Sequence, residues 1–265
     1  MQLKRDDCSR PANAEMCRQE LVSLHTSILG QIRSLDLISK SSLLGERCMN
    51  ELQSAKAPWG VAMQIGSVKQ YFQVYQKVLG CLPYAAIEEA KEALLRGYKQ
   101  DQSIFLFGNG GSAALASHFA CDLGKGAVVN GNGQKRFRVL ALTDNVALMT
   151  AWANDTCYER VFAEQLHNFV APGDVALAIS GSGNSPNVLC ALEVAREAGA
   201  VNIGLTGFRG GDMKHLCDIC IIIPSENMQI IEDLHLSVTH AIFSVIRQRL
   251  SDNVQVNALH GVASR

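Results

Sequence analysis

The sequence predicts an α/β protein with a doubly wound parallel sheet, and three observations lead to this fold class. The chain has 265 residues, 48% of them hydrophobic, which is enough for one sizeable domain and an appendage. From residue 103 onward, short apolar segments alternate with amphipathic ones. The apolar segments are continuous rather than alternating, which is typical of strands that helices cover on both faces.

The elements follow in order along this pattern. Two helices are expected before the first strand, at 68–79 and 84–98, and could pack together. The predicted strands are 104–107, 138–142, 175–179, 201–205 and 219–223. The helices that cover them are expected at 112–123, 145–153, 158–169 and 185–197, and a long helix over 228–250 closes the domain.

Both ends of the chain lie outside this pattern. Residues 1–61 are predicted to be an N-terminal helical extension and linker, with a helix over 14–35 and a linker that ends in Ala57-Pro58-Trp59-Gly60. Residues 251–265 show little periodicity, so we expect a frayed C-terminal tail.

Charge and hydropathy exclude several classes of function. The formal net charge is −1 and no run of Lys and Arg stands out, which argues against direct nucleic-acid binding. The sequence contains no stretch of about 18 apolar residues, the length that a membrane-spanning helix needs. Its N-terminus lacks the apolar core of a signal peptide. We therefore expect a cytoplasmic protein that does not bind membranes.

The nine cysteines are odd in number and scattered, which favours reduced thiols over a disulfide framework. Cys217 and Cys220 form a single C-x-x-C pair where the chain enters the last predicted strand. Because a redox or zinc site of this type would call for a second pair, we interpret them as packing residues of the core and the sheet edge.

A loop of serines and glycines follows the third predicted strand, from Ser180 to Ser185. Its glycines let the backbone approach an anion, the next helix offers free N–H groups, and the three serine hydroxyls add neutral donors. The loop lacks the lysine of an NTP-binding P-loop. We therefore predict that it binds a single phosphate monoester.

A second tight turn, Gly108-Asn109-Gly110-Gly111-Ser112, follows the first predicted strand. It presents backbone amides at the same edge of the sheet as the serine loop, so the two turns together predict a ligand site. Taken alone, this turn fits a sharp chain reversal equally well.

Ionisable residues recur at helical spacing in two predicted helices. His118 and Asp122 are four residues apart, and Glu232 and His240 are eight apart, so each pair lies near one helix face. Two histidines and two carboxylates suit zinc or a similar divalent ion, and without metal they could move protons near neutral pH. Satisfied polar contacts are the alternative, and Asp233 and His235 are rival residues in the same helix.

Thr143 and Asp144 follow the second predicted strand. A carboxylate at this position could accept hydrogen bonds from sugar hydroxyls, and an ordinary helix N-cap is the alternative role for Asp144.

These motifs occur in an order that resembles the SIS domain of the phosphoheptose isomerases, over residues 62–250. The resemblance rests on the Gly-Asn-Gly-Gly-Ser turn, the His-Phe-Ala after it, the serine loop, and the helix that carries Leu234-His235 and His240. It implies a flavodoxin-like five-stranded parallel sheet and a homotetramer with its sites at subunit interfaces.

The resemblance also implies an aldose–ketose isomerase that converts sedoheptulose 7-phosphate to D-glycero-D-manno-heptose 7-phosphate through an enediol, with zinc bound nearby. His118 and His240 match two histidine ligands, Asp122 stands at a glutamate position, and Glu232 stands at a glutamine ligand position. These four residues are the expected metal set. Asp122 and His240 are the expected proton carriers.

Substrate contacts are implied in the same way. Gly181 stands where a threonine is usual, and Gln229 replaces an acidic residue that touches substrate in the family. The expected substrate-binding residues are Asn109, Gly110, Gly111, Ser112, Asp122, Thr143, Asp144, Ser180, Gly181, Ser182, Ser185 and Glu232.

Two other functions are alternatives to the enzyme. The segments Thr143 to Val146 and Ala153 to Asp155 are similar to those of the DnaA initiator-associating proteins, non-catalytic tetramers that bind another protein. A sensor domain of a transcription regulator would require a DNA-binding module, for which the first 60 residues are too short and too weakly basic.

Overall fold

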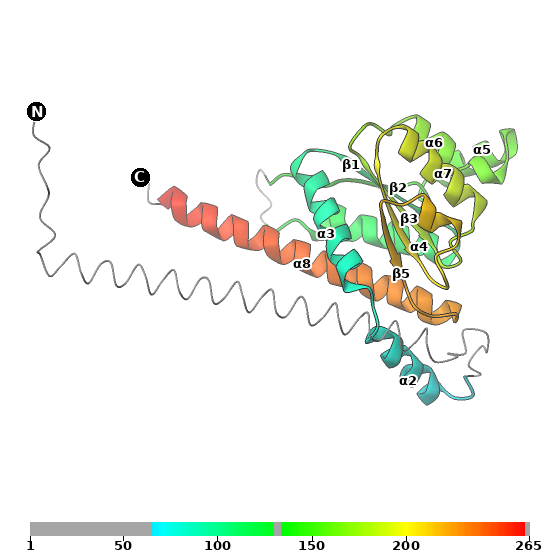
Figure 1. The fold of residues 1–265 in the computed structure, drawn as a ribbon. Helices are drawn as coiled ribbons and strands as arrows, with labels where there is room; N and C mark the ends of the chain where they lie inside the picture. Colours follow the sequence, from blue (N-terminus) through cyan, green and yellow to red (C-terminus); the bar gives the residue numbers. More distant parts are fainter. Residues whose placement is uncertain (1–64, 130–133, 263–265) are drawn as a thin grey trace, which may run out of the picture. The chain divides into compact units, whose positions relative to one another are not determined.

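A computed structural model describes residues 65–129 and 134–262 of the chain (Figure 1). The helix expected over 14–35 and the linker that ends at Gly60 lie outside the described residues. The predicted α/β architecture is confirmed for the part that follows.

The sheet consists of five parallel strands in the order β2-β1-β3-β4-β5. Their bounds are β1 Ser103–Gly108, β2 Arg138–Ala141, β3 Val175–Ser180, β4 Val201–Thr206 and β5 Ile219–Ile222. All five predicted strands are confirmed. The order reverses between β1 and β3, and such a switch point opens a crevice beyond the carboxyl ends of the two strands. In the register, Gly108 pairs with Ile179, so the turn after β1 and the loop after β3 begin side by side.

Helices cover both faces of the sheet (Figure 1). One face packs against α3 Tyr84–Lys99, α4 Gly111–Cys121 and α8 Met228–Val262, and the other against α6 Ala163–His167 and α7 Pro186–Glu197. Strand β1 shows why its sequence is continuously apolar. Ile104 and Leu106 enter the first cluster, whereas Phe105 and Phe107 enter the second.

Two further helices lie at the margins of this core. Helix α5, Val146–Asp155, follows β2 and has no fully buried residue. Helix α2, Val68–Leu79, has the predicted bounds and likewise buries no residue completely. The Tyr71 hydroxyl donates to Asp233, and Tyr75 and Ser237 share a hydrogen bond of 2.8 Å, which ties α2 to α8.

Three predicted helix limits were wrong. Helix α8 does not end at Leu250 but continues to Val262, because no glycine or proline interrupts the sequence before Gly261. The helix expected over 158–169 is divided into a 3₁₀ turn, Tyr158–Arg160, and α6, since Val161 and Phe162 between them turn into the core. Helix α4 ends at Cys121 and continues as a π-helical turn, η1, over Asp122–Gly126.

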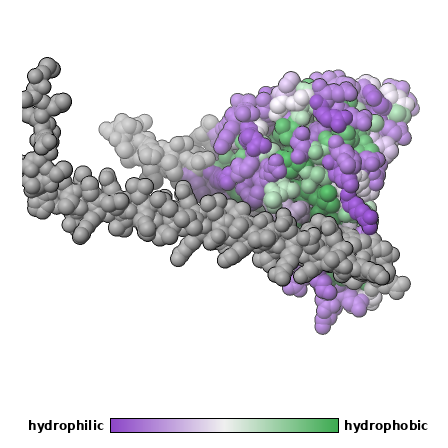
Figure 2. Space-filling view, in the orientation of Figure 1, coloured by the Kyte–Doolittle hydropathy of each residue, from purple (hydrophilic) through white to green (hydrophobic). Residues whose placement is uncertain are grey.

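In Figure 2, hydrophilic residues lie mainly around the edge of the visible face, and an area of hydrophobic residues lies between them. Within the described ranges, no helix is both long and apolar enough to cross a membrane.

Candidate functional site

The turn after β1 is sharp because its glycines allow close contacts. A Cβ on Gly108 would lie 2.5 Å from the carbonyl oxygen of Ile179 on the neighbouring strand. Gly110 has a φ of +55°, in the region that favours glycine, and α4 begins at the next residue. These constraints place the N-terminus of α4 directly beyond the carboxyl end of β1.

The side chain of Asn109 fixes this turn against α7. Asn109 and Asn187 exchange two amide hydrogen bonds of 2.8 Å each, and the Tyr158 hydroxyl donates to Asn109 Oδ1 at 3.0 Å. Sequence reasoning missed both partners, although the place of Asn187 at the start of a helix beside the serine loop was a usable signal. Substrate contact by Asn109 stays a prediction.

The serine loop forms a compact cradle after β3. Ser180 and Ser185 share a hydrogen bond of 3.1 Å between their hydroxyls, and Ser182 Oγ accepts from the backbone N–H of Asn184 at 3.2 Å. Gly183 has a φ of +69°, and a Cβ there would lie 2.2 Å from the carbonyl oxygen of Gly210. The glycine therefore lets the loops after β3 and β4 pack against each other.

The start of α7 leaves the backbone N–H of Asn187 beside these hydroxyls, because Pro186 has no N–H and the N–H of Val188 donates to the carbonyl oxygen of Ser185 at 3.0 Å. Ser185 is the N-cap residue but makes no capping hydrogen bond with its side chain, and the first turn carries no acidic residue. An N–H group at a helix start, the helix dipole and three hydroxyls are features that bind a phosphate group. The arrangement is chemically suited to the predicted phosphate monoester.

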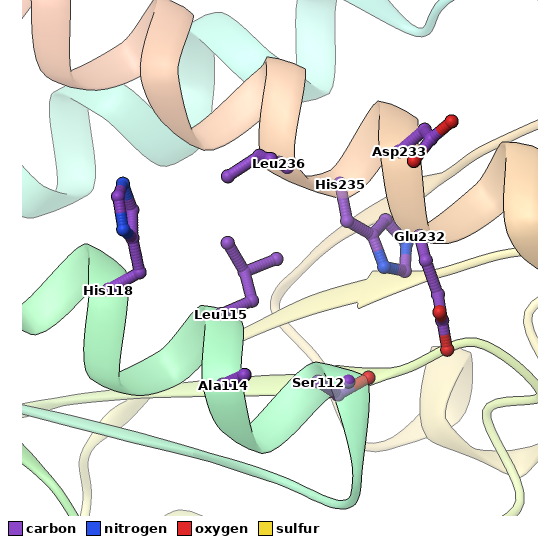
Figure 3. A pocket seen from close by; sticks show the side chains of 9 residues that line it. Ser112, Ala114, Leu115, His118, Glu232, Asp233, His235 and Leu236 are labelled. Carbon is purple, nitrogen blue, oxygen red and sulfur yellow. The ribbon is translucent and has the colours of Figure 1, made fainter.

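A cavity of about 290 Å³ lies between α4 and α8 (Figure 3). Ser112 and Glu232 lie at one end and His118 at the other, with Leu115 and Leu236 between them. Its lining comprises Gly111, Ser112, Ala114, Leu115, His118, Glu232, Asp233, His235 and Leu236. The cavity thus connects the turn after β1 with the C-terminal half of α4.

Three of the four predicted metal ligands come together. His118 Nε2 and His240 Nε2 are hydrogen-bonded at 2.9 Å, and Asp122 Oδ2 lies 3.5 Å from the first and 3.9 Å from the second. The two imidazoles are about half exposed, whereas the Asp122 side chain is 20% exposed. One Nε2 donates and the other accepts in this hydrogen bond, and the tautomers of the rings decide which one donates.

This group fits a divalent cation. Asp122 Oδ2 is buried and has no hydrogen-bond partner, which leaves a carboxylate oxygen uncompensated beside two imidazole nitrogens. One ligand atom from each of the three residues lies within 4.8 Å of the others. Imidazole nitrogen and carboxylate oxygen are ordinary zinc ligands.

Gly126 allows η1 and α8 to approach closely enough for Asp122 and His240 to lie near each other. A Cβ on Gly126 would lie 2.7 Å from Cζ of Phe243, so the ring packs directly on the glycine. Phe243 lies one turn after His240 on α8, and Asp122 begins the π-helical turn that contains Gly126. Such turns occur frequently at functional sites.

Glu232 is not a member of this group in the structure. Its carboxylate lies beside Gly111, where an added Cβ would be 3.1 Å from Oε2. Eight residues separate it from His240, which corresponds to about 12 Å along a helix axis. Its position is at the Ser112 end of the cavity, and its role as a metal ligand stays a prediction.

The rival residues Asp233 and His235 have other partners. Asp233 accepts the hydroxyl hydrogen of Tyr71, whose pKa rises to about 12 through burial and this carboxylate. His235 is buried, and its Nε2–H donates to the carbonyl oxygen of Thr206 at 3.1 Å. Burial lowers the pKa of His235 to about 4, so it is neutral at pH 7.

Asp144 is not a helix N-cap, because Asn145 takes that role and accepts from the backbone N–H of Leu148 at 3.0 Å. Ser117 donates to the Asp144 carboxylate and lies 3.3 Å from Thr143 Oγ1. Thr143 and Asp144 are therefore held against α4 at Ser117, the residue that precedes His118. Their contact with substrate stays a prediction.

Comparisons with known proteins identify the family to which the chain is similar. The SIS domain family matches residues 70–207. A phosphoheptose isomerase from Trichlorobacter lovleyi is 39% identical over 190 residues, which cover 69% of this chain and 91% of the relative. One from Aliarcobacter butzleri is 41% identical over 168 residues, covering 62% and 86%.

Solved structures of this kind have the same fold. The phosphoheptose isomerase of Neisseria gonorrhoeae superposes with a TM-score of 0.59 at 31% identity, covering 68% of this chain and 92% of the other. The phosphoheptose isomerase of Francisella tularensis gives a TM-score of 0.61 at 29% identity, covering 68% and 96%.

Proposed function

Because the chain belongs to the phosphoheptose isomerase family of SIS-domain proteins, we propose that it interconverts sedoheptulose 7-phosphate and D-glycero-D-manno-heptose 7-phosphate. It is a sugar-phosphate isomerase, an enzyme that exchanges a ketose for an aldose. The observation that carries the proposal is the cavity that connects Ser112 of the first turn with His118 of the ionisable group. The sugar part of one substrate could occupy the cavity, with its phosphate at the serine loop, which lies outside the cavity lining.

The phosphate end is assigned to the serine loop. The hydroxyls of Ser180, Ser182 and Ser185 and the backbone N–H of Asn187 at the start of α7 would hold the phosphate oxygens. Gly181 contributes backbone only. Binding energy from this remote group holds the reacting carbons in position, which is a large part of catalysis in such reactions.

The sugar itself is assigned to the walls of the cavity. The turn from Asn109 to Ser112, with Glu232 at the same end of the cavity, would orient the hydroxyls next to the phosphate. Thr143 and Asp144, which are held by Ser117 outside the cavity lining, would contact hydroxyls further along. The apolar side chains of Leu115 and Leu236 would exclude water from the carbon skeleton.

The chemical step moves one proton between C1 and C2 and one between their oxygens. The Asp122 carboxylate, which has a free oxygen, would accept the C1 proton and return it to C2 of the enediol. His240 would carry the hydroxyl proton from O1 to O2, with His118 orienting its ring through the 2.9 Å hydrogen bond. No proton is gained or lost overall.

We also propose that His118, Asp122 and His240, with Glu232 as the fourth residue, bind zinc. Zinc, when bound, would act as a Lewis acid that polarises the sugar carbonyl and stabilises negative charge on its oxygen. One nitrogen cannot hold a metal ion and a proton together. His240 would therefore carry a proton in the metal-free protein and bind the ion in the metal-loaded protein, so both preparations must be assayed.

The test is turnover by the full chain. Purified protein, chelator-treated or supplied with zinc, is incubated with sedoheptulose 7-phosphate, and the aldose phosphate is measured. We expect product in at least one of the two preparations. Absence of turnover in both, across several ketose phosphates, would contradict the proposed function.

A homotetramer and a cytoplasmic location complete the proposal. Support for association comes from α2, where Val68 is 74% exposed and Phe72 61% exposed on one apolar stripe. Phe72→Glu should lower the molecular mass measured by light scattering. Gln73→Glu adds the same charge at a neighbouring exposed polar residue and should leave the mass unchanged.

The non-catalytic scaffold has no comparable support, because the relatives described above are named as isomerases. It makes a distinct prediction. A scaffold would retain an initiator protein in a pull-down after Asp122→Ala and would show no turnover before the substitution.

A further inference from the structure

Two cysteines lie together at the entrance to β5, outside the cavity. Cys217 precedes the strand, and Cys220 lies within it and pairs with Gly204 of β4. Gly204 provides the space for both sulfur atoms. A Cβ at this position would lie 2.7 Å from Cys217 Sγ and 3.6 Å from Cys220 Sγ. The two thiols therefore share one site over the backbone of β4.

The two thiols differ in chemical character. A hydrogen bond from Cys217 lowers the pKa of Cys220 against the effect of burial, and the charge of Lys214 assists. The same hydrogen bond and burial raise the pKa of Cys217. Of the two sulfurs, Cys220 is the one on which a thiolate is favoured, with Cys217 as its S–H donor.

The surrounding backbone holds the pair in place. Asn202 Nδ2 donates to the carbonyl oxygen of Leu216 at 2.9 Å, and the Asp218 carboxylate accepts from the backbone N–H of Asn202 at 2.8 Å. Cys217, just before β5, and Cys220, within it, are both partly exposed, and β5 is an edge strand of the sheet. Neither residue is closed off from solvent.

A metal site is a weaker assignment for the same pair. In the described ranges, the only group of three or more metal-ligating side chains is that of His118, Asp122 and His240. Two thiols without a third ligand do not complete a structural zinc site, which takes four. Two thiols without a metal can still exchange with a disulfide.

We propose that Cys217 and Cys220 form a dithiol that a small-molecule disulfide, of the glutathione class, oxidises reversibly to an intramolecular disulfide. The Cys220 thiolate attacks one sulfur of the oxidant and expels the other half as a thiolate, which takes up a proton. Cys217 then loses its proton and attacks Cys220 Sγ, and this step releases the second half as a thiol. Two protein thiols are oxidised and one external disulfide is reduced to two thiols.

The full chain is equilibrated in buffers of defined oxidised and reduced glutathione, alkylated, and mapped by peptide mass spectrometry. We expect a peptide that has lost two hydrogen atoms between Cys217 and Cys220, and that regains them with reductant. Cys81 is disulfide-bonded, contrary to the reduced thiols expected from the sequence, and peptide mapping separates that bond from this one. No such peptide at any glutathione ratio would overturn the proposal.

Two single variants test the order of the steps. Cys217→Ser should accumulate glutathione on Cys220, because the resolving thiol is gone, whereas Cys220→Ser should leave Cys217 largely unmodified. Cys190→Ser removes a partly exposed cysteine elsewhere and should still form the bond. Equal modification of the two single variants, or modification of Cys217 alone, would overturn the assigned roles. None of these measurements uses isomerase activity, so their outcome is independent of the proposed function.

Discussion

The sulfur of Met228 occupies the space into which a side chain on Gly181 would extend. A Cβ at Gly181 would lie 2.4 Å from Met228 Sδ and 3.3 Å from its Cε. Gly181 is the position of the serine loop at which the family pattern has a threonine. The missing hydroxyl is thus matched by a methionine at the first residue of α8.

This contact predicts a coupled pair of substitutions. Gly181→Thr alone should destabilise the protein by about 1–3 kcal/mol, because the new side chain overlaps that of Met228, which must leave its place. Adding Met228→Ala should recover most of that loss and introduce a hydroxyl beside the phosphate cradle. Urea unfolding of the four proteins in the cycle measures the coupling. Strictly additive effects would show that the contact is without energetic consequence.

A second prediction concerns Gly126 and Phe243. In Gly126→Ala the new methyl group would press on the ring, and moving Phe243 should shift His240 away from Asp122. We expect weaker zinc binding by titration calorimetry together with a loss of about 1–3 kcal/mol in unfolding free energy. Phe243→Leu in the same chain should restore both. A Gly126→Ala protein with unchanged zinc affinity would disprove the role of this contact.

The third prediction is a pH dependence that originates at His235. Its pKa is lowered to about 4 in the folded chain from an ordinary value of 6.5, so the unfolded chain binds the proton more readily. Above pH 6.5 this histidine therefore does not reduce the free energy of unfolding. As the pH falls from 6.5 toward 4, the free energy of unfolding decreases by up to roughly 3 kcal/mol.

The variant His235→Gln should flatten this part of the stability curve between pH 6.5 and 4. Chemical unfolding at several pH values measures the slope. His167→Gln removes an exposed histidine and should leave the slope unchanged. A wild-type slope that persists in His235→Gln would assign the proton uptake to another group.

A fourth prediction addresses the unpartnered oxygen of Asp122. Asp122→Asn removes the charge that faces His118 and His240, so zinc affinity should fall and kcat should drop by about 10²–10⁴-fold. Relief of the buried carboxylate should leave the unfolding free energy unchanged or higher. Asp252→Asn, on an exposed position of α8, is the matched control. Wild-type turnover in Asp122→Asn would remove this residue from the mechanism.

Much of the fold could be predicted because hydrophobic periodicity is a local property. Continuous apolar segments such as 175–179 identified all five strands, and β1 shows the reason, since its successive side chains enter opposite clusters. The ends of helices that depend on tertiary packing were harder to predict from the sequence. The π-helical turn at Asp122 and the division between Tyr158 and His167 arise from tertiary contacts that no local pattern encodes.

The candidate site was predictable to the extent that its motifs are contiguous. The turn from Asn109 to Ser112 and the loop from Ser180 to Ser185 follow neighbouring strands, and spacing alone identified His118 and Asp122 as one face. Spacing could not choose between His235 and His240, because both are on α8. Packing decided, by turning His235 toward Thr206 and His240 toward Asp122.

The sequence by itself determined the class of fold, the order of its strands and helices and the chemical types at the sheet edge, because periodicity and turn chemistry act over a few residues. Only the tertiary structure decided which ionisable groups meet. It brought His118 within 2.9 Å of His240, across 122 positions of sequence, and left Glu232 beside Gly111. Contacts of that range depend on how two helices pack, and close approach at residues such as Gly126 sets that packing.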